Sequence, residues 1–323
     1  MSHLRNHRNA GTIDRASGAA AAALKARAVA WDVPLIEAPD AMSLSVWGCE
    51  LRLVPDGSAL RVELSAPDAR LIGTLQDSAT DLFAEAGLEV RWDRVDAGAL
   101  APGLSLMRVV SVTRRPGRFL RVRLAGPDAA RFGIGSLHFR LLLPPAGRVP
   151  VWPRVGATGR TEWPQGADAL HRPVYTVAAQ QEDWLDFDIV RHDGSPTYDW
   201  ALSDPCGTEI GIVGPGGGWC PDADRLHLFG DETALPAIAR MLDLARGAVT
   251  AHVRASYPDL GPLAADPRVT RCDNLLEALA QADRTPGAFV WFAANAAQAR
   301  QARQHLLARG MDRTDFTAAA YWV

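Results

Sequence analysis

The sequence lacks the patterns of a membrane protein or a secreted protein. No run of about 18 apolar residues occurs in its 323 residues, which excludes a membrane-spanning helix. The N-terminal stretch has no apolar core of the kind a signal peptide needs, and charged residues interrupt the Ala-rich run that follows. We therefore expect a cytoplasmic protein with no membrane partner.

Cysteine is scarce, and lysine is scarcer. The four cysteines lie far apart and form no C-x-x-C pair, so neither a zinc knuckle nor a ferredoxin-type cluster is predicted. Almost all of the 34 cationic residues are arginine, but they form no basic tract and the net charge is −3. We expect no bound metal and no nucleic-acid partner. The composition, 48% hydrophobic and 22% charged, is that of a globular protein with two or three domains.

The first 100 residues predict a small α+β domain with a helix-prone tail. Apolar and polar residues alternate over 43–53 and 59–65, and Pro55-Asp56-Gly57 between these runs indicates a hairpin. Apolar residues at helical spacing predict a helix over 69–86. The domain shows no cluster of side chains at catalytic or metal-ligand spacing, so we expect a packing or regulatory role.

Residues 101–222 predict a second domain built from short strands. Strand-like runs recur at 106–112, 119–124, 137–143, 174–177, 184–191 and 208–213. Short strands at this spacing are typical of an antiparallel barrel or sandwich. A Pro/Gly-rich loop from 144 to 173 interrupts them, and a loop of this length inside a compact domain is more often functional than idle.

Residues 223–323 alternate strands with helices, which predicts a doubly wound parallel sheet. The expected strands are 226–229, 248–254 and 288–293, and the expected helices are 234–246, 273–282 and 296–309. Ligands bind such sheets at the carboxyl ends of the strands. The turn Gly230-Asp231-Glu232-Thr233 stands at one of these ends.

The turn from Gly230 to Thr233 has two interpretations. The first N–H groups of a helix lack partners within it and the helix dipole favours negative charge, so a phosphate could sit there. The carboxylates of Asp231 and Glu232 would repel phosphate and could cap the helix themselves. The residues alone favour an ordinary capped turn but leave both interpretations open.

Several motifs follow one another in a recognisable order. They are LHFRLLLP (137–144), HRPVYTV (171–177), LDFDIVRH (185–192), Trp200-Ala201, VGPGGG (213–218), GDETALPAI (230–238), FVWFAA (289–294) and Tyr321-Trp322. In this order they resemble the siderophore-interacting proteins, a branch of the ferredoxin reductase-like flavoproteins. Residues 43–95 resemble, less sharply, a small uncharacterised α/β domain sometimes found beside such proteins. The resemblance implies an antiparallel β-barrel for FAD followed by a doubly wound parallel domain for NAD(P).

The resemblance also implies a function. Members of this family use FAD to pass electrons from NAD(P)H, or in some cases from ferredoxin, to a ferric siderophore, and the iron leaves as Fe(II). The flavin carries the chemistry, so no catalytic side chain is expected. Two alternatives stay open: a degenerate, non-catalytic flavin- or siderophore-binding module, and a general NAD(P)H-dependent flavin reductase. The siderophore, the electron donor and the oligomeric state are left open too.

The family pattern places the flavin against an aromatic-hydroxyl pair. Tyr175 would stack on the isoalloxazine, and Thr176 would hydrogen-bond near its reactive nitrogen, although a strand tyrosine alone is more often a core residue. The full set of implied cofactor contacts is Arg172, Tyr175, Thr176, Val177, His192, Gly194, Thr197, Trp200, Ala201, Gly230, Asp231, Glu232 and Thr233. Arg154 and Arg160, on the long loop, are candidates for holding an anionic ferric chelate.

Two positions depart from the family pattern. Ala178 stands where an arginine commonly follows the Y-T-V, and the loss of one charge-assisted contact could weaken FAD binding roughly tenfold. Asn295 stands where the family usually has glutamate, which alters the expected nicotinamide side. The glycine-rich segment 213–218 permits close backbone approach to a ligand or forms an interdomain turn, and the residues do not decide between these.

Overall fold

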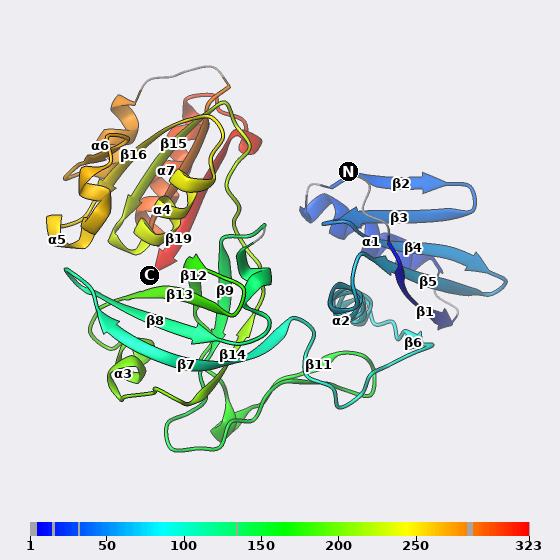
Figure 1. Cartoon of the computed structure of the whole chain (residues 1–323). Helices are drawn as coiled ribbons and strands as arrows, with labels where there is room; N and C mark the ends of the chain where they lie inside the picture. The colour runs from blue at the N-terminus through cyan, green and yellow to red at the C-terminus, as the bar shows by residue number, and fades with distance from the viewer. Residues whose placement is uncertain (1–4, 15–16, 32, 134, 283–286, 323) are drawn as a thin grey trace. The chain divides into compact units, whose positions relative to one another are not determined.

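The computed structural model describes residues 5–14, 17–31, 33–133, 135–282 and 287–322 (Figure 1). By its internal contacts the chain divides into two compact units. Unit 1 comprises Met1–Leu104 and Gly147–Leu170, and unit 2 comprises Ser105–Ala146 and His171–Val323. Within the described ranges, no helix combines the length and the apolar character that crossing a membrane requires.

Unit 1 contains a six-stranded antiparallel sheet in the order β2-β3-β4-β5-β1-β6, together with two helices. The strands are β1 (His7–Asp14), β2 (Leu35–Ala38), β3 (Ala41–Val46), β4 (Cys49–Asp56), β5 (Ala59–Ala66) and β6 (Arg91–Trp92), and the helices are α1 (Ser17–Trp31) and α2 (Ala69–Glu85). Buried side chains alternate with mostly half-buried ones along β4 and β5, as expected for a sheet with one well-covered face. Leu24 of α1 and Phe83 of α2 are fully buried in the same core as Val62 and Leu64 of β5.

The structure confirms the expected helix in unit 1 and corrects one expected strand. The run 43–53 is a hairpin of β3 and β4, because Trp47 and Gly48 both adopt positive φ, 50° and 78°, and reverse the chain. Strand β1 was missed, since its sequence, HRNAGTID, is mostly polar. It nevertheless pairs with β5 along its whole length.

The long loop belongs partly to unit 1. Residues 147–170 contain the short strands β10 (Arg154–Val155) and β11 (Thr161–Glu162) and the 3-10 turn η2 (Gly166–Asp168). The backbone N–H of Thr161 donates to Asp77 Oδ1 on α2 at 2.6 Å. We expected this loop within the barrel domain, whereas its contacts group it with α2. The three-way division at residues 100 and 222 stays a prediction.

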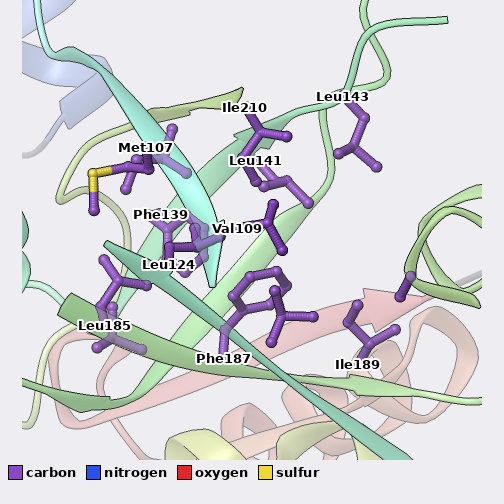
Figure 2. Packing of buried hydrophobic residues seen from close by; sticks show 14 of the residues in the cluster. Met107, Val109, Leu124, Phe139, Leu141, Leu143, Leu185, Phe187, Ile189 and Ile210 are labelled. Atoms are coloured by element: carbon purple, nitrogen blue, oxygen red, sulfur yellow. The ribbon is translucent and has the colours of Figure 1, made fainter. Parts of the chain in front are cut away.

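The first part of unit 2 is a closed six-stranded barrel in the order β12-β13-β8-β7-β14-β9. Its strands are β7 (Leu104–Arg114), β8 (Phe119–Ala125), β9 (His138–Leu142), β12 (Val174–Gln180), β13 (Trp184–Val190) and β14 (Glu209–Val213), with η1 (Ala129–Gly133) and α3 (Pro196–Leu202) beside them. Figure 2 shows apolar side chains from several of these strands meeting in the barrel interior. The rings of Phe139 and Phe187 meet edge-to-face, with centroids 5.4 Å apart.

The second part of unit 2 is a five-stranded parallel sheet in the order β17-β16-β15-β18-β19. Its strands are β15 (Arg225–Asp231), β16 (Ala248–Arg254), β17 (Val269–Arg271), β18 (Phe289–Asn295) and β19 (Phe316–Trp322). Its helices are α4 (Leu235–Leu244), α5 (Tyr257–Leu260), α6 (Leu275–Gln281) and α7 (Ala296–Ala308), with the 3-10 turns η3 (Glu232–Ala234), η4 (Gly261–Ala265) and η5 (Arg313–Asp315). The predicted alternation of strands and helices is confirmed, and β17 and β19 add an edge strand on each side.

Arginine side chains join the barrel to the parallel sheet inside unit 2. Arg240 of α4 donates to the carbonyl oxygens of Leu137, at 3.0 Å, and Phe132, at 3.1 Å. Arg118, in the turn between β7 and β8, pairs with Glu232 at 2.9 Å. Guanidinium groups suit this task because several donors leave one planar group.

Candidate functional site

Strand β12 carries two of the predicted site residues in succession, Tyr175 and Thr176, and their side chains have different partners. The ring of Tyr175 packs on Phe187 of the barrel core with centroids 5.0 Å apart. Its hydroxyl lies near Thr197 of α3, and burial raises the pKa of Tyr175 to about 12. The structure thus joins two predicted contacts that lie 22 positions apart in the sequence. The next residue, Thr176, is 7% exposed.

The segment around α3 divides into buried and exposed residues. Thr197 is 1% exposed, and Ala201 belongs to the barrel core, against which Trp200 also packs. Gly194 adopts a φ of 75° with open space where a Cβ would point, so the backbone conformation rather than crowding favours glycine there. His192 lies exposed on the surface.

Val177 and Arg172 are two further predicted cofactor contacts on or beside β12. The side chain of Val177 is 2% exposed and belongs to the barrel core, and its backbone N–H donates to the carbonyl oxygen of Leu137 at 3.1 Å. Arg172 is exposed, and its carbonyl oxygen accepts a hydrogen bond from Arg140 of β9 at 2.8 Å. Arg172 therefore lies at the barrel surface just before β12.

A histidine that sequence reasoning did not single out stands behind Thr176. His138 of β9 is paired with Thr176 across the β9–β12 ladder, and its Nδ1 lies 3.0 Å from the Thr176 hydroxyl. Its Nε2 lies 3.2 Å from the Tyr321 hydroxyl on β19. The chain Thr176, His138, Tyr321 links the barrel to the last strand of the parallel sheet. The motif LHFRLLLP contains this histidine, but nothing in the sequence indicates that it contacts Thr176 and Tyr321.

The surroundings of His138 keep its ring neutral. Burial, and secondarily the charge of Arg240, lowers the pKa of His138 from 6.5 to about 4. Gly218 lies against the ring, because a Cβ at that position would meet His138 Nε2 at 2.7 Å. Close packing on the histidine therefore explains one glycine of the glycine-rich segment.

The side chains of the turn at the end of β15 bind one another and residues of other elements. Asp231 is 0% exposed and accepts from Thr233 N at 3.0 Å, Thr233 Oγ1 at 2.5 Å and Trp322 Nε1 at 2.9 Å. Glu232 pairs with Arg118. Gly230 leaves no room for a side chain, since a Cβ would lie 2.6 Å from Ala234 Cβ. These contacts are those of a capped turn, one of the two interpretations left open by the sequence.

The two arginines predicted to hold the substrate belong to unit 1. Arg160 Nε lies 2.5 Å from Asp81 Oδ1 on α2. Arg154 donates through Nη1 to the carbonyl oxygen of Gly98 at 2.6 Å. Each guanidinium is thus engaged by a partner within that unit, and the role of both arginines in substrate binding stays a prediction.

Both departures from the family pattern have a structural setting. Ala178 lines a cavity of about 410 Å³ in unit 2, beside Arg121 and Asp188, whose side chains form a two-pronged ion pair at 2.8 and 2.7 Å. Asn295 caps α7, accepting from Gln298 N at 2.8 Å. In the described part of the chain, no three His, Cys, Asp or Glu side chains are grouped so as to hold a metal ion.

Comparison with known proteins places this site in a family. Residues 108–219 match the siderophore-interacting FAD-binding domain, and residues 223–323 match the siderophore-interacting protein family. A siderophore utilization protein from T. fusca has 30% sequence identity and a TM-score of 0.56, and the likeness covers 71% of this chain and 95% of that one. The chain belongs to the siderophore-interacting protein family.

Other named proteins also resemble the chain. The ferric vibriobactin reductase ViuB of Vibrio cholerae is 33% identical over 137 residues, which cover 38% of this chain and 48% of ViuB. The ferric acinetobactin reductase of Acinetobacter baumannii is 25% identical over 170 residues, which cover 46% of this chain and 59% of that enzyme. The chain therefore spans about half the length of the curated relatives it matches. The siderophore-interacting protein SipS from Aeromonas hydrophila has the same fold, with a TM-score of 0.56 at 24% identity over 68% of this chain and 91% of that one.

Proposed function

We propose that this family member is an FAD-dependent oxidoreductase that passes electrons from NAD(P)H to a ferric siderophore and releases Fe(II). The observation that carries the proposal is the match of residues 108–219 to the FAD-binding domain of the family, over a barrel whose strand β12 presents Tyr175 and Thr176 in succession. Relatives named as ferric vibriobactin and ferric acinetobactin reductases support the reaction class.

The donor set on β12 and α3 fits a flavin. A flavin needs an apolar, aromatic surface for its ring and hydrogen-bonding groups at its polar edge, and this site offers Tyr175, the buried Thr176 hydroxyl and Thr197. Arg172 supplies a cation for the pyrophosphate at the start of the strand. Bound FAD would supply the electron transfer between NAD(P)H, a two-electron donor, and Fe(III), a one-electron acceptor.

The side chains of the site then have defined tasks. Tyr175 would support the flavin ring, and the hydroxyl of Thr176 would meet the polar edge of the ring near its reactive nitrogen. Burial of Thr176 and Thr197, at 7% and 1% exposure, keeps water away from their hydroxyls and makes their hydrogen bonds strong and directional. Neutral His138 holds the Thr176 hydroxyl from behind.

The visible spectrum of the purified protein tests this proposal. We expect a yellow protein that takes up added FAD, loses its colour anaerobically with NADH or NADPH, and regains it when a ferric siderophore is added. A protein that does not take up FAD would rule the proposal out. Equal rates with ferric siderophores, simple ferric chelates and free flavin would instead indicate a general NAD(P)H-dependent flavin reductase.

A second candidate is a binding module that keeps the flavin or siderophore site without turnover. The residues that we expect to face the nicotinamide favour this second candidate, because their side chains already contact other parts of the protein. Asp231, Glu232 and Thr233 all contact protein partners, and Asn295 caps α7. A protein that binds FAD but is not reduced by NADH or NADPH, while dithionite reduces it, would support this module over the reductase.

A further inference from the structure

Thr176, His138 and Tyr321 form a continuous hydrogen-bonded chain across three strands. His138 Nδ1 lies 3.0 Å from Thr176 Oγ1, and His138 Nε2 lies 3.2 Å from the Tyr321 hydroxyl. The histidine and tyrosine rings meet edge-to-face, with centroids 5.8 Å apart and an interplanar angle of 81°. Both ring nitrogens are therefore engaged, and each partner is a hydroxyl that can donate or accept.

A neutral imidazole gives this chain a direction. One ring nitrogen carries a proton and the other carries a lone pair, so the ring donates at one end and accepts at the other. If Nδ1 carries the proton, it donates to Thr176, whose own hydroxyl proton is then free to point outward. If Nε2 carries the proton, Thr176 donates to Nδ1 and offers only its oxygen outward. The tautomer of His138 thus decides what Thr176 presents to a ligand.

Burial, with a contribution from one nearby charge, holds the ring in the neutral form. Arg240 lies close enough to disfavour a second positive charge, and its guanidinium is fixed by the carbonyl oxygens of Leu137 and Phe132. Tyr321 itself is held neutral, because burial, with a contribution from the charge of Asp231, raises its pKa. Neither His138 nor Tyr321 ionises near neutral pH. A change of the His138 tautomer is therefore the proton rearrangement that this chain can undergo.

We propose that His138 is a positioning residue that reverses the polarity of the Thr176 hydroxyl by changing tautomer, with Tyr321 completing the chain in both states. The hydroxyl then stays fully hydrogen-bonded to a redox ligand whose facing atom accepts when oxidised and carries a proton when reduced. The inference rests on the proposed function, since the flavin nitrogen N5 is such an atom. It assigns Tyr321 a part in the flavin site.

Removal of His138 has a defined consequence for the redox balance. Without His138, the Thr176 hydroxyl can still donate to the oxidised ligand, and only a lone pair of its oxygen lacks a donor. With the reduced ligand, the Thr176 oxygen accepts from the ligand and its hydroxyl proton has no acceptor. An unpaired buried donor costs more than an under-used oxygen lone pair. We expect His138→Phe to shift the ratio of oxidised to reduced flavin about tenfold toward the oxidised form, which corresponds to a potential about 30 mV lower.

The fold contains a matched control for this substitution. His227 of β15 lies with its Nδ1 2.8 Å from the Thr250 hydroxyl, in the parallel sheet, and is 8% exposed. His227→Phe removes the same kind of histidine-threonine bond and should lower the melting temperature without moving the flavin potential. His138→Asn is the conservative variant. Its amide can turn either its oxygen or its NH₂ group toward Thr176, so it should restore at least half of the shift.

The deciding measurement is the tautomer itself. Two-bond ¹H–¹⁵N spectra of the imidazole rings, with His138 assigned by comparison with His138→Asn, should show a neutral ring. The proton should favour Nδ1 with oxidised FAD bound and move toward Nε2 after anaerobic reduction by dithionite. A tautomer that stays the same in both redox states, or a potential of His138→Phe equal to that of the unmodified protein, overturns the inference.

The outcomes separate this inference from the proposed function. FAD uptake with reduction by NAD(P)H but no change of tautomer overturns the role of His138 alone. Failure of the unmodified protein to take up FAD overturns both. If His138→Phe does not retain FAD, Tyr321→Phe replaces it, because that variant keeps the bond between Thr176 and His138. Its potential should fall by a smaller amount in the same direction, and an unchanged potential contradicts the proposal.

Discussion

Strand β12 and the turn from Gly230 to Thr233 both carry clear family motifs, yet they use their polar groups in different ways. On β12, the hydroxyl of Thr176 is supported from behind by His138, a partner that can donate or accept. At the turn, the carboxylate of Asp231 binds Thr233 and Trp322, and Glu232 binds Arg118. A turn that carries a family motif can therefore serve the structure, whereas the hydroxyl of Thr176 keeps a partner that can donate or accept.

Loss of the Asp231 carboxylate should have the largest effect on the structural side of this comparison. Asp231→Ala removes a fully buried carboxylate and leaves the N–H of Thr233 and the indole N–H of Trp322, a side chain that is 45% exposed, without their acceptor. We expect the free energy of unfolding to fall by about 3 kcal/mol. Urea denaturation followed by tryptophan fluorescence measures it, with the exposed Asp193→Ala as control. Unchanged stability with weaker nucleotide binding would make the turn a ligand site.

Acid should lower the stability of the barrel through protonation of His138. Its pKa of about 4 in the folded protein lies below the ordinary 6.5, so the unfolded chain binds a proton between these values that the folded chain does not. The stability from the neutral ring is complete above pH 6.5 and is lost as the pH falls to 4. Between pH 6.5 and pH 4, the free energy of unfolding of the unmodified protein should fall by about 3 kcal/mol more than that of His138→Phe. Urea denaturation at each pH measures both. Parallel losses would contradict a buried, neutral His138.

Gly230→Ala tests the packing of the turn by a smaller step. The added methyl group would lie 2.6 Å from Ala234 Cβ and 2.8 Å from Ile238 Cδ1, so α4 has to move away from β15. We expect a loss of about 2 kcal/mol in unfolding free energy. Gly194→Ala has no such clash, since its Cβ would point into open space, and it reports only the strain of positive φ. Equal stability of Gly230→Ala and the unmodified protein would show that the turn is loosely packed.

Ala178→Arg should have the smallest effect, and it acts on the ligand side. The cavity beside Ala178 gives an arginine side chain room, and a restored charge-assisted contact should tighten FAD binding about tenfold. Quenching of flavin fluorescence during titration measures the dissociation constant. Ala178→Gln, similar in length but uncharged, serves as the matched control. If neither Ala178→Arg nor the unmodified protein binds FAD, β12 has no role in flavin binding and, like the turn, serves only the structure.

The strongly periodic parts of the fold could be predicted from the sequence. The barrel strands and the βα alternation follow from residue patterns that depend on near neighbours, and the capping role of Asp231 was one of two stated interpretations. Strand β1 could not be predicted, because its burial arises from pairing with β5, about 50 positions away. The role of His138 was hidden for the same reason, since Tyr321 lies 183 positions further along the chain.

The assignment of Gly147–Leu170 to unit 1 has a consequence for how the protein can be divided. The chain passes between the two units at three places, after Leu104, Ala146 and Leu170, so unit 1 is not a cassette that one cut removes. A deletion that ends at residue 104 would strip the inserted segment of the helix that carries Asp77 and leave it attached to the barrel. Any recombination that exchanges the N-terminal unit must therefore exchange the insertion with it, and the two segments are expected to be inherited as a pair.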